Sequence, residues 1–158
     1  MLKQVQHDDV HRRLIMYKIS TRGQYALLIM EDLASADAEK YVPLKLLSHR
    51  RNLSVKYLEQ ILIQLSKSGL VTGIRGSNGG YKLAKPSSEY TAGEILRAME
   101  GELSPKGIQS DDNNTVLSEG SKKFWKSFDS TINQFVDSVT LDEIAKTSNS
   151  FTGYEYSI

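Results

Sequence analysis

The 158 residues suffice for one medium-sized domain, or a small domain with an oligomerisation element, but not for two full domains. Hydrophobic residues make up 39% of the chain and charged residues 25%, and no apolar run approaches the ~18 residues that a membrane span requires. Residues 1–15 also lack the apolar core of a secretory signal, so we expect a cytoplasmic protein with no membrane partner. The absence of cysteine excludes disulfides, thiolate zinc sites, cysteine-ligated iron–sulfur clusters and cysteine nucleophiles.

The net charge of +1 conceals an asymmetry along the chain. Residues 16–85 contain eleven lysines and arginines against five acidic residues, a net charge of +6. Residues 86–158 contain six against twelve, a net charge of −6. A basic front half joined to an acidic rear half suggests that the front half meets a polyanion, although chance clustering on solvated faces would give the same count.

The front half predicts two helices after a leading extension at residues 1–15, which need not be native. Apolar residues recur at spacings of three and four from Tyr25 to Ala34, which indicates a helix. Pro43 then opens a short apolar segment that ends near Asn52 and predicts a helix of two turns.

The clearest helix follows Ser54, whose hydroxyl is a good N-cap, and ends before Gly69, which stands at the expected left-handed position. Residues 70–74 and 81–84 are strand-like and flank a basic, glycine-rich tip, so they predict a β-hairpin. Helix, turn, capped helix and hairpin form the order of a winged helix-turn-helix, which we assign to residues 16–86 as a DNA-binding domain. The expected buried stripe of the capped helix comprises Val55, Leu58, Ile61, Leu62 and Leu65.

The rear half predicts a linker helix, a polar loop and a dimerisation helix within residues 87–147, then a flexible C-terminal tail at 148–158. Thr91 and Thr140 each open a capping box, and residues 103–115 are polar. A helix of about twenty residues follows the loop, and its apolar stripe is expected to pack on a second copy of the chain. The fold class is therefore mainly α with a small β-hairpin. The stripe comprises Phe124, Phe128, Ile132, Phe135 and Val139.

The N-terminal residues of the second helix in a helix-turn-helix reach base edges in the major groove. Glutamine can bond adenine, a carboxylate can accept from cytosine, and lysine can serve guanine or phosphate. A glutamate that faces a polyanion is costly unless it reads a base, so Glu59 is the specificity candidate. The alternatives are that Glu59 pairs with a nearby lysine and that Tyr57 packs on the domain edge. The candidate readers are Ser54, Lys56, Tyr57, Glu59 and Gln60.

Other basic residues suit the DNA backbone and the minor groove. Arg75 begins the glycine-rich tip and fits the negative potential of a narrow minor groove, unless it is an ordinary solvated loop arginine. Lys18, Thr21 and Arg22 precede or begin the first helix, where hydroxyls, cationic side chains and free amides suit phosphate contacts. A nucleotide-binding loop is excluded because the glycines lie between strands and no Gly-Lys-Ser/Thr ending follows them.

The sequence offers little for catalysis or metal binding. His7 and His11 stand four residues apart, but two ligands without others make a poor metal site, and no Ser/His/Asp grouping has a supporting context. We expect no catalytic residue, no metal and no enzymatic activity. A winged domain used only for protein association remains an alternative, which the +6 charge and the polar face of the recognition helix disfavour.

These ordered features resemble the Rrf2 family of bacterial winged-helix regulators, from Met16 to about Ala145. The resemblance implies that the five candidate readers and Arg75 contact DNA and that the stripe between residues 117 and 139 forms the dimer helix. The matching segments are 18–23, 25–27, Ser54 with 57–60, 69–71, 75–76, 79–81, 93–95, 100–101 and 140–141.

Many members of that family hold an iron–sulfur cluster through three cysteines in the loop before the dimer helix, which corresponds here to residues 103–121. Since this chain has no cysteine, we expect no cluster and no other cofactor. The cysteine-free branch that represses cysteine metabolism in Gram-positive bacteria is the most similar, on residues 28–33, 100–101, 104–105, 140–143 and above all 154–158.

That branch implies a cytoplasmic homodimer that binds a palindromic operator in double-stranded DNA and represses genes of cysteine and sulfur metabolism. It also implies cysteine synthase (O-acetylserine thiol-lyase) as corepressor. That enzyme grips a C-terminal peptide ending in isoleucine, so Tyr156, Ser157 and Ile158 are expected to enter its active site. The alternatives are a frayed tail, or a cysteine-free member with another regulon that senses a small molecule between the winged domain and the dimer helix.

Overall fold

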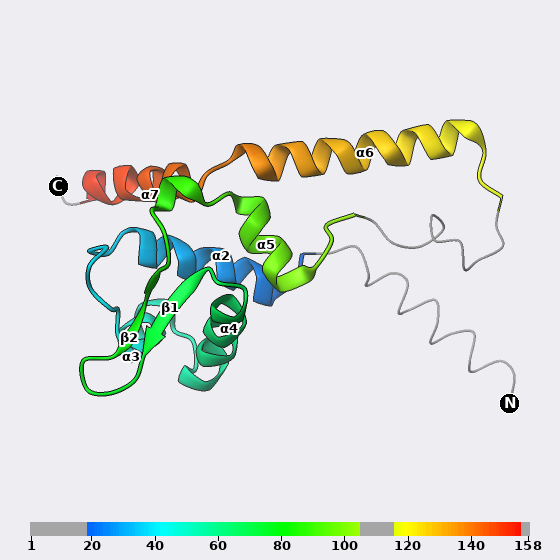
Figure 1. Cartoon of the computed structure of the whole chain (residues 1–158). Helices are drawn as coiled ribbons and strands as arrows, with labels where there is room; N and C mark the ends of the chain where they lie inside the picture. The colour runs from blue at the N-terminus through cyan, green and yellow to red at the C-terminus, as the bar shows by residue number, and fades with distance from the viewer. Residues whose placement is uncertain (1–18, 105–115, 156–158) are drawn as a thin grey trace, which may run out of the picture.

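The computed structural model describes residues 19–104 and 116–155. Figure 1 shows α2 to α5 and the hairpin gathered in one body, with α6 extending from it as a long rod. The hairpin tip, α3 and α4 lie on the side of the body opposite α6. The predicted fold class, mainly α with a winged helix-turn-helix, is confirmed. The elements are α2 (Thr21–Ala34), α3 (Leu44–Arg51), α4 (Val55–Lys67), β1 (Val71–Ile74), β2 (Gly80–Leu83), η1 (Ser87–Glu89), α5 (Ala92–Glu100), α6 (Glu119–Ser138) and α7 (Leu141–Glu155).

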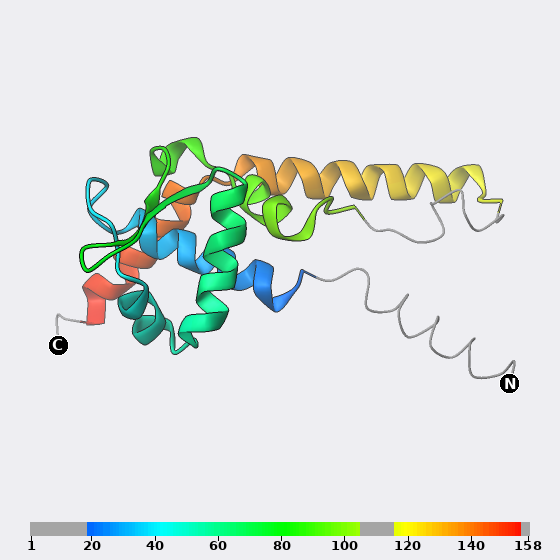
Figure 2. The ribbon, with the colours of Figure 1, turned by 60° about the horizontal axis from the view of Figure 1, so that its bottom comes forward.

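The antiparallel hairpin matches the predicted strands within one residue, with Ile74 opposite Gly80. Figure 2 shows β1 leaving the end of α4. Val42, just before α3, adds a bridge: its N–H donates to the Tyr81 carbonyl at 2.8 Å, and the Tyr81 N–H donates to the Val42 carbonyl at 3.0 Å. A Cβ on Gly80, whose φ is 148°, would lie 2.1 Å from the Val42 oxygen, so this approach requires glycine. The wing and the helix-turn-helix are thereby joined.

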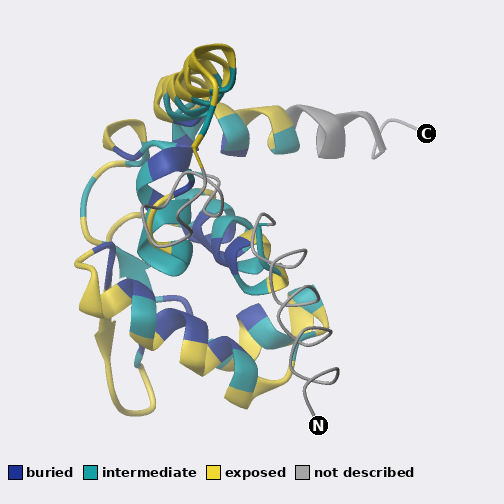
Figure 3. Ribbon diagram, turned by 90° about the vertical axis from the view of Figure 1, so that its right-hand side faces the viewer, coloured by how far each residue is buried: buried dark blue, intermediate teal, exposed yellow. Residues whose placement is uncertain are grey.

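The core lies where α2, α4 and α5 meet, and α3 and α7 contribute to it. Figure 3 shows buried residues in the body of the molecule and exposed residues along the outer side of α6. The predicted stripe of α4 is confirmed except at Val55, which is 42% exposed. Val55 is the first residue of the helix, and contact with the core begins one turn later, at Leu58. The most buried residues include Ala26, Ile29, Met30, Leu47, Leu58, Ile61, Leu62, Leu65, Tyr90, Ile95 and Leu141.

Tyr90 is fully buried and ties the base of the hairpin to the rear helices. Its hydroxyl donates to the Leu70 carbonyl at 2.6 Å and accepts from the N–H groups of Ala84 (2.9 Å) and Lys85 (3.1 Å). Its carbonyl accepts from the Leu141 N–H at 3.0 Å. Burial raises the pKa of the phenol above its ordinary value. The protonated phenol therefore stabilises the folded state fully when the pH is below the ordinary tyrosine pKa. This contribution to the free energy of unfolding is lost as the pH rises through the raised pKa.

The two predicted capping boxes lie side by side, because Thr91 and Thr140 form an antiparallel bridge. The box at Thr140 is complete: its N–H donates to the Glu143 carboxylate at 3.1 Å, and the Glu143 N–H donates to its hydroxyl at 3.2 Å. The box at Thr91 is half formed. Its hydroxyl accepts from the Glu94 N–H at 3.1 Å, but the Glu94 carboxylate pairs with Lys85 at 3.0 Å instead of turning back.

The C-terminal segment differs from the prediction of a flexible tail beginning at Ser148, because α7 continues as helix to Glu155. The Ser148 hydroxyl bonds the Glu31 carboxylate on α2 and also donates to the Ile144 carbonyl at 3.3 Å. These contacts hold α7 against α2 beyond the predicted boundary, and local composition does not reveal them. Tyr156, Ser157 and Ile158, the predicted docking residues, lie outside the described residues.

We expect Tyr90→Phe to lower the free energy of unfolding by about 2–3 kcal/mol, because the Leu70 carbonyl and Lys85 N–H would lose a buried partner. Tyr41→Phe is the matched control, since the Tyr41 hydroxyl has no hydrogen bond in the described part of the chain and its loss should cost under about 0.5 kcal/mol. Urea unfolding followed by circular dichroism measures both. Equal stabilities for the two variants would contradict the role given to the Tyr90 hydroxyl.

Candidate nucleic-acid interface

The turn between α3 and α4 sets the start of the second helix. Asn52 ends α3 in the left-handed conformation, with φ 52°, and the Ser54 hydroxyl accepts from the Tyr57 N–H at 3.2 Å. The predicted N-cap is confirmed. Because a hydroxyl can accept and donate together, Ser54 still has a proton to offer outward while it caps the helix.

The first two turns of α4 present a polar face. Lys56, Glu59 and Gln60 are exposed, and none makes a side-chain hydrogen bond or ion pair within residues 19–104 and 116–155. The alternative in which Glu59 pairs with a lysine is therefore not seen there. Tyr57 differs, because it is half-buried and its ring meets that of Tyr25 edge-on, with centroids 6.0 Å apart. The ring of Tyr57 thus packs on the domain edge, which was the alternative expected for this residue.

Charged residues of the hairpin tip and of the first two turns of α4, here called the reading end, lie near the same tyrosine. Arg75 is exposed at the tip, and Tyr81 lies on β2. Burial raises the pKa of the Tyr81 phenol, the charge of Glu59 raises it further, and the charge of Arg75 lowers it. Glu59 on α4 and Arg75 on the hairpin thus both lie close enough to Tyr81 to act on its phenol.

The start of α2 is less open than the sequence suggested. The Ser20 N–H donates to the Glu100 carboxylate at 2.9 Å, the Ser20 hydroxyl bonds the same oxygen, and the Gly23 N–H donates to Ser20 Oγ at 3.1 Å. The Ser20 hydroxyl thus caps α2, and a carboxylate from α5 binds the Ser20 N–H, so these two amides are already bonded within the chain. Thr21 is exposed, and Arg22 is half-buried with its Nε buried and unpartnered among the described residues. Lys18 lies outside them.

A buried ion pair positions α3 against α2, and sequence reasoning missed it. Asp32, 4% exposed, accepts from the Arg51 guanidinium at 2.7 and 2.6 Å, and Arg50 approaches the same carboxylate at 3.6 Å. This hydrogen bond raises the pKa of Arg51. Two of the arginines counted in the basic front half are therefore directed at Asp32. The available signal was an aspartate among the apolar residues of α2.

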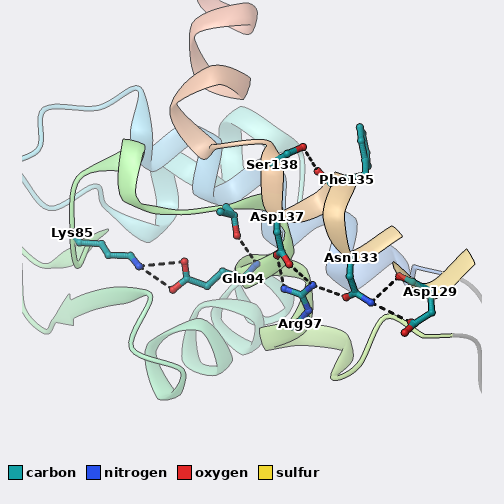
Figure 4. Close-up of polar contacts among 9 residues, drawn as sticks. Lys85, Glu94, Arg97, Asp129, Asn133, Phe135, Asp137 and Ser138 are labelled. Carbon is teal, nitrogen blue, oxygen red and sulfur yellow. Dashed lines mark hydrogen bonds and ion pairs between the residues drawn. The ribbon is translucent and has the colours of Figure 1, made fainter. Parts of the chain in front are cut away.

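One face of α6 is polar and holds the rod to its own body (Figure 4). Arg97 of α5 donates to Asp137 at 2.6 Å and to the Asn133 side chain at 2.6 Å. The Asn133 amide in turn donates to the Asp129 carboxylate at 3.1 Å. These α6 residues recur every four positions, and the hydrogen bond from Arg97 lowers the pKa of Asp137.

The predicted apolar stripe lies on another face of α6. Phe135 points away from the Arg97 contacts in Figure 4 and is 67% exposed, and Phe124 is 59% exposed. Such large aromatic surfaces are unusual on a free helix. Val139 is the C-cap residue rather than part of the helix, and the unpredicted Val136 is buried. The half-buried stripe members are Phe128, Ile132 and Val139.

A hollow of about 660 Å³ runs beside this rod. All of its lining residues belong to α6, so it is a surface of the rod and not a pocket between the winged domain and α6. It gives no support to direct sensing of a small molecule at such a junction. The lining comprises Lys126, Asp129, Ser130, Asn133, Gln134, Asp137 and Ser138.

Comparison with known families gives a match over residues 19–147, which include the winged body and α6. The matching family is Rrf2, described as an iron-dependent transcriptional regulator. The chain belongs to the Rrf2 family. An Rrf2 regulator is what the ordered motifs predicted, and that prediction is confirmed.

Relatives of this Rrf2 protein are transcription regulators. The HTH-type transcriptional regulator CymR of Bacillus subtilis (strain 168) is 38% identical over 128 residues, 81% of this chain and 89% of the relative. IscR of Pectobacterium carotovorum subsp. carotovorum (strain PC1) is 32% identical over 133 residues, 80% and 78% respectively. The solved structure of CymR, described as the global cysteine regulator of B. subtilis, has a TM-score of 0.73 and 37% identity, covering 82% of this chain and 97% of that one. These relatives confirm a regulator rather than an enzyme.

The iron in the family description does not fit this Rrf2 chain as a cysteine-ligated cluster, because no cysteine occurs anywhere in the sequence. In the described residues, no three His, Cys, Asp or Glu side chains are grouped to hold a metal ion. His7 and His11 lie outside that part. None of the described helices has the length and apolar character needed to cross a membrane.

Proposed function

We propose that this Rrf2 protein is a dimeric repressor that reads a palindromic operator and controls genes of cysteine and sulfur supply in the cytoplasm. The polar, unpaired start of α4 beside the basic hairpin tip carries the DNA-reading part. A helix of this kind enters the major groove with its first residues at the base edges. Identity to CymR, whose solved structure is described as that of a global cysteine regulator, supports the regulon.

The proposed roles follow the position of each residue. Glu59 and Gln60 read base edges, because their side chains are exposed and offer carboxylate and amide groups. Arg75 enters the adjacent minor groove from the hairpin tip. Lys18, Thr21 and Arg22 contact phosphates before and at the start of α2. The base-facing set is completed by Ser54, Lys56 and the exposed part of Tyr57.

Pairing of two copies through α6 accounts for its exposed aromatic face. Phe124 and Phe135 are the most exposed members of the stripe and would be buried by a second rod. In Figure 1 α6 lies on the side of the body away from α3, α4 and the hairpin tip, so pairing there leaves both reading surfaces free. A two-fold axis between the rods makes the half-sites inverted repeats.

The proposed corepressor is cysteine synthase. Tyr156, Ser157 and Ile158 would enter its active site as an extended peptide, with the terminal carboxylate held by backbone amides. O-acetylserine would compete for the same site, so the regulator would sense whether that substrate is present. The preceding residues 148–155 continue α7, which contacts α2 of the winged body.

Full-length protein should select an inverted-repeat duplex from a random DNA pool, with affinity that falls steeply as salt rises. Glu59→Ala should relax the preference at one base pair of each half-site, a loss of about 1–3 kcal/mol of discrimination. Glu39→Ala, an equal change at an exposed loop residue, should leave the selected sequence unchanged. An unaltered preference in Glu59→Ala would remove Glu59 from the reading set, and no selection by the unmodified protein would overturn the DNA proposal.

Phe135→Glu should convert the protein to a monomer in sedimentation velocity, because a charge would replace an aromatic group of the proposed contact between the rods. The fold should persist, since the Phe135 side chain is 67% exposed in one copy. Gln134→Glu, the neighbouring residue outside the stripe, should remain dimeric. A dimeric Phe135→Glu variant would place the interface elsewhere.

Immobilised full-length protein should retain cysteine synthase, and O-acetylserine should weaken the retention. A variant lacking Ile158 should lose it while binding the selected duplex as before, which shows that the winged body is intact. Retention by both versions would rule out docking through Ile158. Retention by neither, together with normal DNA binding, would favour an Rrf2 regulator that senses a small molecule.

A further inference from the structure

A groove of about 240 Å³ separates the C-terminal half of α4 from the hairpin. It is distinct from the reading end of α4, because its helix residues lie in the last two turns. Its walls combine polar groups with exposed aliphatic groups. The polar lining residues are Ser66, Lys67, Arg75 and Tyr81, and the aliphatic ones are Ile63 and Ile74.

The polar groups of this groove are donors that lack internal partners. The side chains of Ser66, Lys67, Arg75 and Tyr81 make no hydrogen bond or ion pair within the described ranges. Each can donate to an anionic oxygen, and no carboxylate lines the groove. Glu59 acts on Tyr81 from the reading end, outside the lining. Four convergent donors with two fixed positive charges suit a phosphate group.

Tyr81 is held in place by its cross-strand neighbour. Gly73 pairs with Tyr81 in the hairpin, and a Cβ on Gly73 would lie 2.7 Å from the Tyr81 ring. The ring therefore lies across Gly73, in space that the side chain of any larger residue at position 73 would occupy. A phenol is protonated at neutral pH, so the Tyr81 hydroxyl can donate there, and burial raises its pKa further.

The two aliphatic side chains in the groove suit contact with the sugar of a nucleotide. Ile63 is 43% exposed and Ile74 is 46% exposed, one on the helix and one on the hairpin. Neither contributes to the core cluster, and a protein-facing groove would present more apolar area and fewer free donors. A deoxyribose offers carbon atoms for contact with such side chains next to each phosphate.

A helix in the major groove and a wing in the adjacent minor groove must have one DNA strand between them. We propose that the groove between α4 and the hairpin seats that strand, with one phosphodiester per protomer on Ser66, Lys67 and Tyr81 and its sugar against Ile63 and Ile74. Arg75 lines the same groove and keeps its proposed place in the minor groove. The inference rests on the proposed DNA binding, and it adds a phosphate contact that sets where the protein lies along the duplex. This contact adds affinity and fixes the position of the protein on DNA without choosing bases.

The test uses the duplex that full-length protein selects from a random pool, with a neutral methylphosphonate placed at one phosphate at a time. Unmodified protein should lose about tenfold in affinity at one phosphate of each half-site, the loss expected for one charge-assisted bond. In Lys67→Gln that position should lose most of its sensitivity, because the cation that faces the phosphate is gone. In Tyr81→Phe it should lose part of its sensitivity, because one donor is gone and Lys67 remains. Other sensitive positions should stay as they were in both variants. The salt dependence of Lys67→Gln should also fall by about 0.9 in log–log slope for each protomer.

Lys146→Gln on α7 removes the same charge from an exposed side chain far from the groove in sequence, and should keep the full methylphosphonate pattern. Circular dichroism confirms folding of each variant. If unmodified protein binds DNA but neither groove variant alters the pattern, the groove does not bind the strand, while the proposed DNA-binding function is unaffected. If unmodified protein binds no duplex at all, the proposed function itself has failed.

Discussion

The arrangement of helix and wing depends on the hydroxyl of Tyr90. That one oxygen bonds the chain just before β1, at Leu70, and just after β2, at Ala84 and Lys85. The Tyr90 backbone also holds the start of α7 through Leu141. Because the hairpin leaves α4 at the point that Tyr90 fixes, the width of the groove between α4 and the hairpin follows from this buried phenol. The reading surface therefore depends on a residue that cannot touch DNA.

The acidic rear half has a structural use that its net charge does not reveal. Glu94 pairs with Lys85 at the hairpin base, Glu100 accepts from the N–H of Ser20 at the start of α2, and Asp137 binds Arg97. Carboxylates from α5 and α6 thus stabilise groups within the chain, and several lie on contacts that join the rear helices to the basic front half. Part of the charge asymmetry therefore serves contacts between the two halves of the chain.

Local signals in the sequence predicted much of the fold. The caps at Ser54 and Thr140, the periodicity of α4 and α6 and the glycine-rich hairpin each depend on residues a few positions apart. The exceptions depend on distant partners. Glu94 turns to Lys85, and α7 continues past its expected end where Ser148 meets Glu31. No pattern within one segment could have shown these pairings.

The candidate site divides in the same way. Periodicity alone placed Lys56, Glu59 and Gln60 on an outward face, while the packing of Tyr57 on Tyr25 needed the crossing of two helices. The donors between α4 and the hairpin escaped sequence reasoning entirely, because their convergence exists only once the wing has folded back beside the helix.

The bridge between Val42 and Tyr81 makes the wing and the helix-turn-helix move as one piece. With Asp32 clamping α3 to α2 as well, the body has few soft joints among its described elements. Arg97 also ties α5 to Asp137 and Asn133 of α6, so the rod is bonded to the same body. With the proposed pairing through α6, the distance between the two reading surfaces would be set by the contact between the rods, and that distance must match the spacing of the half-sites on DNA.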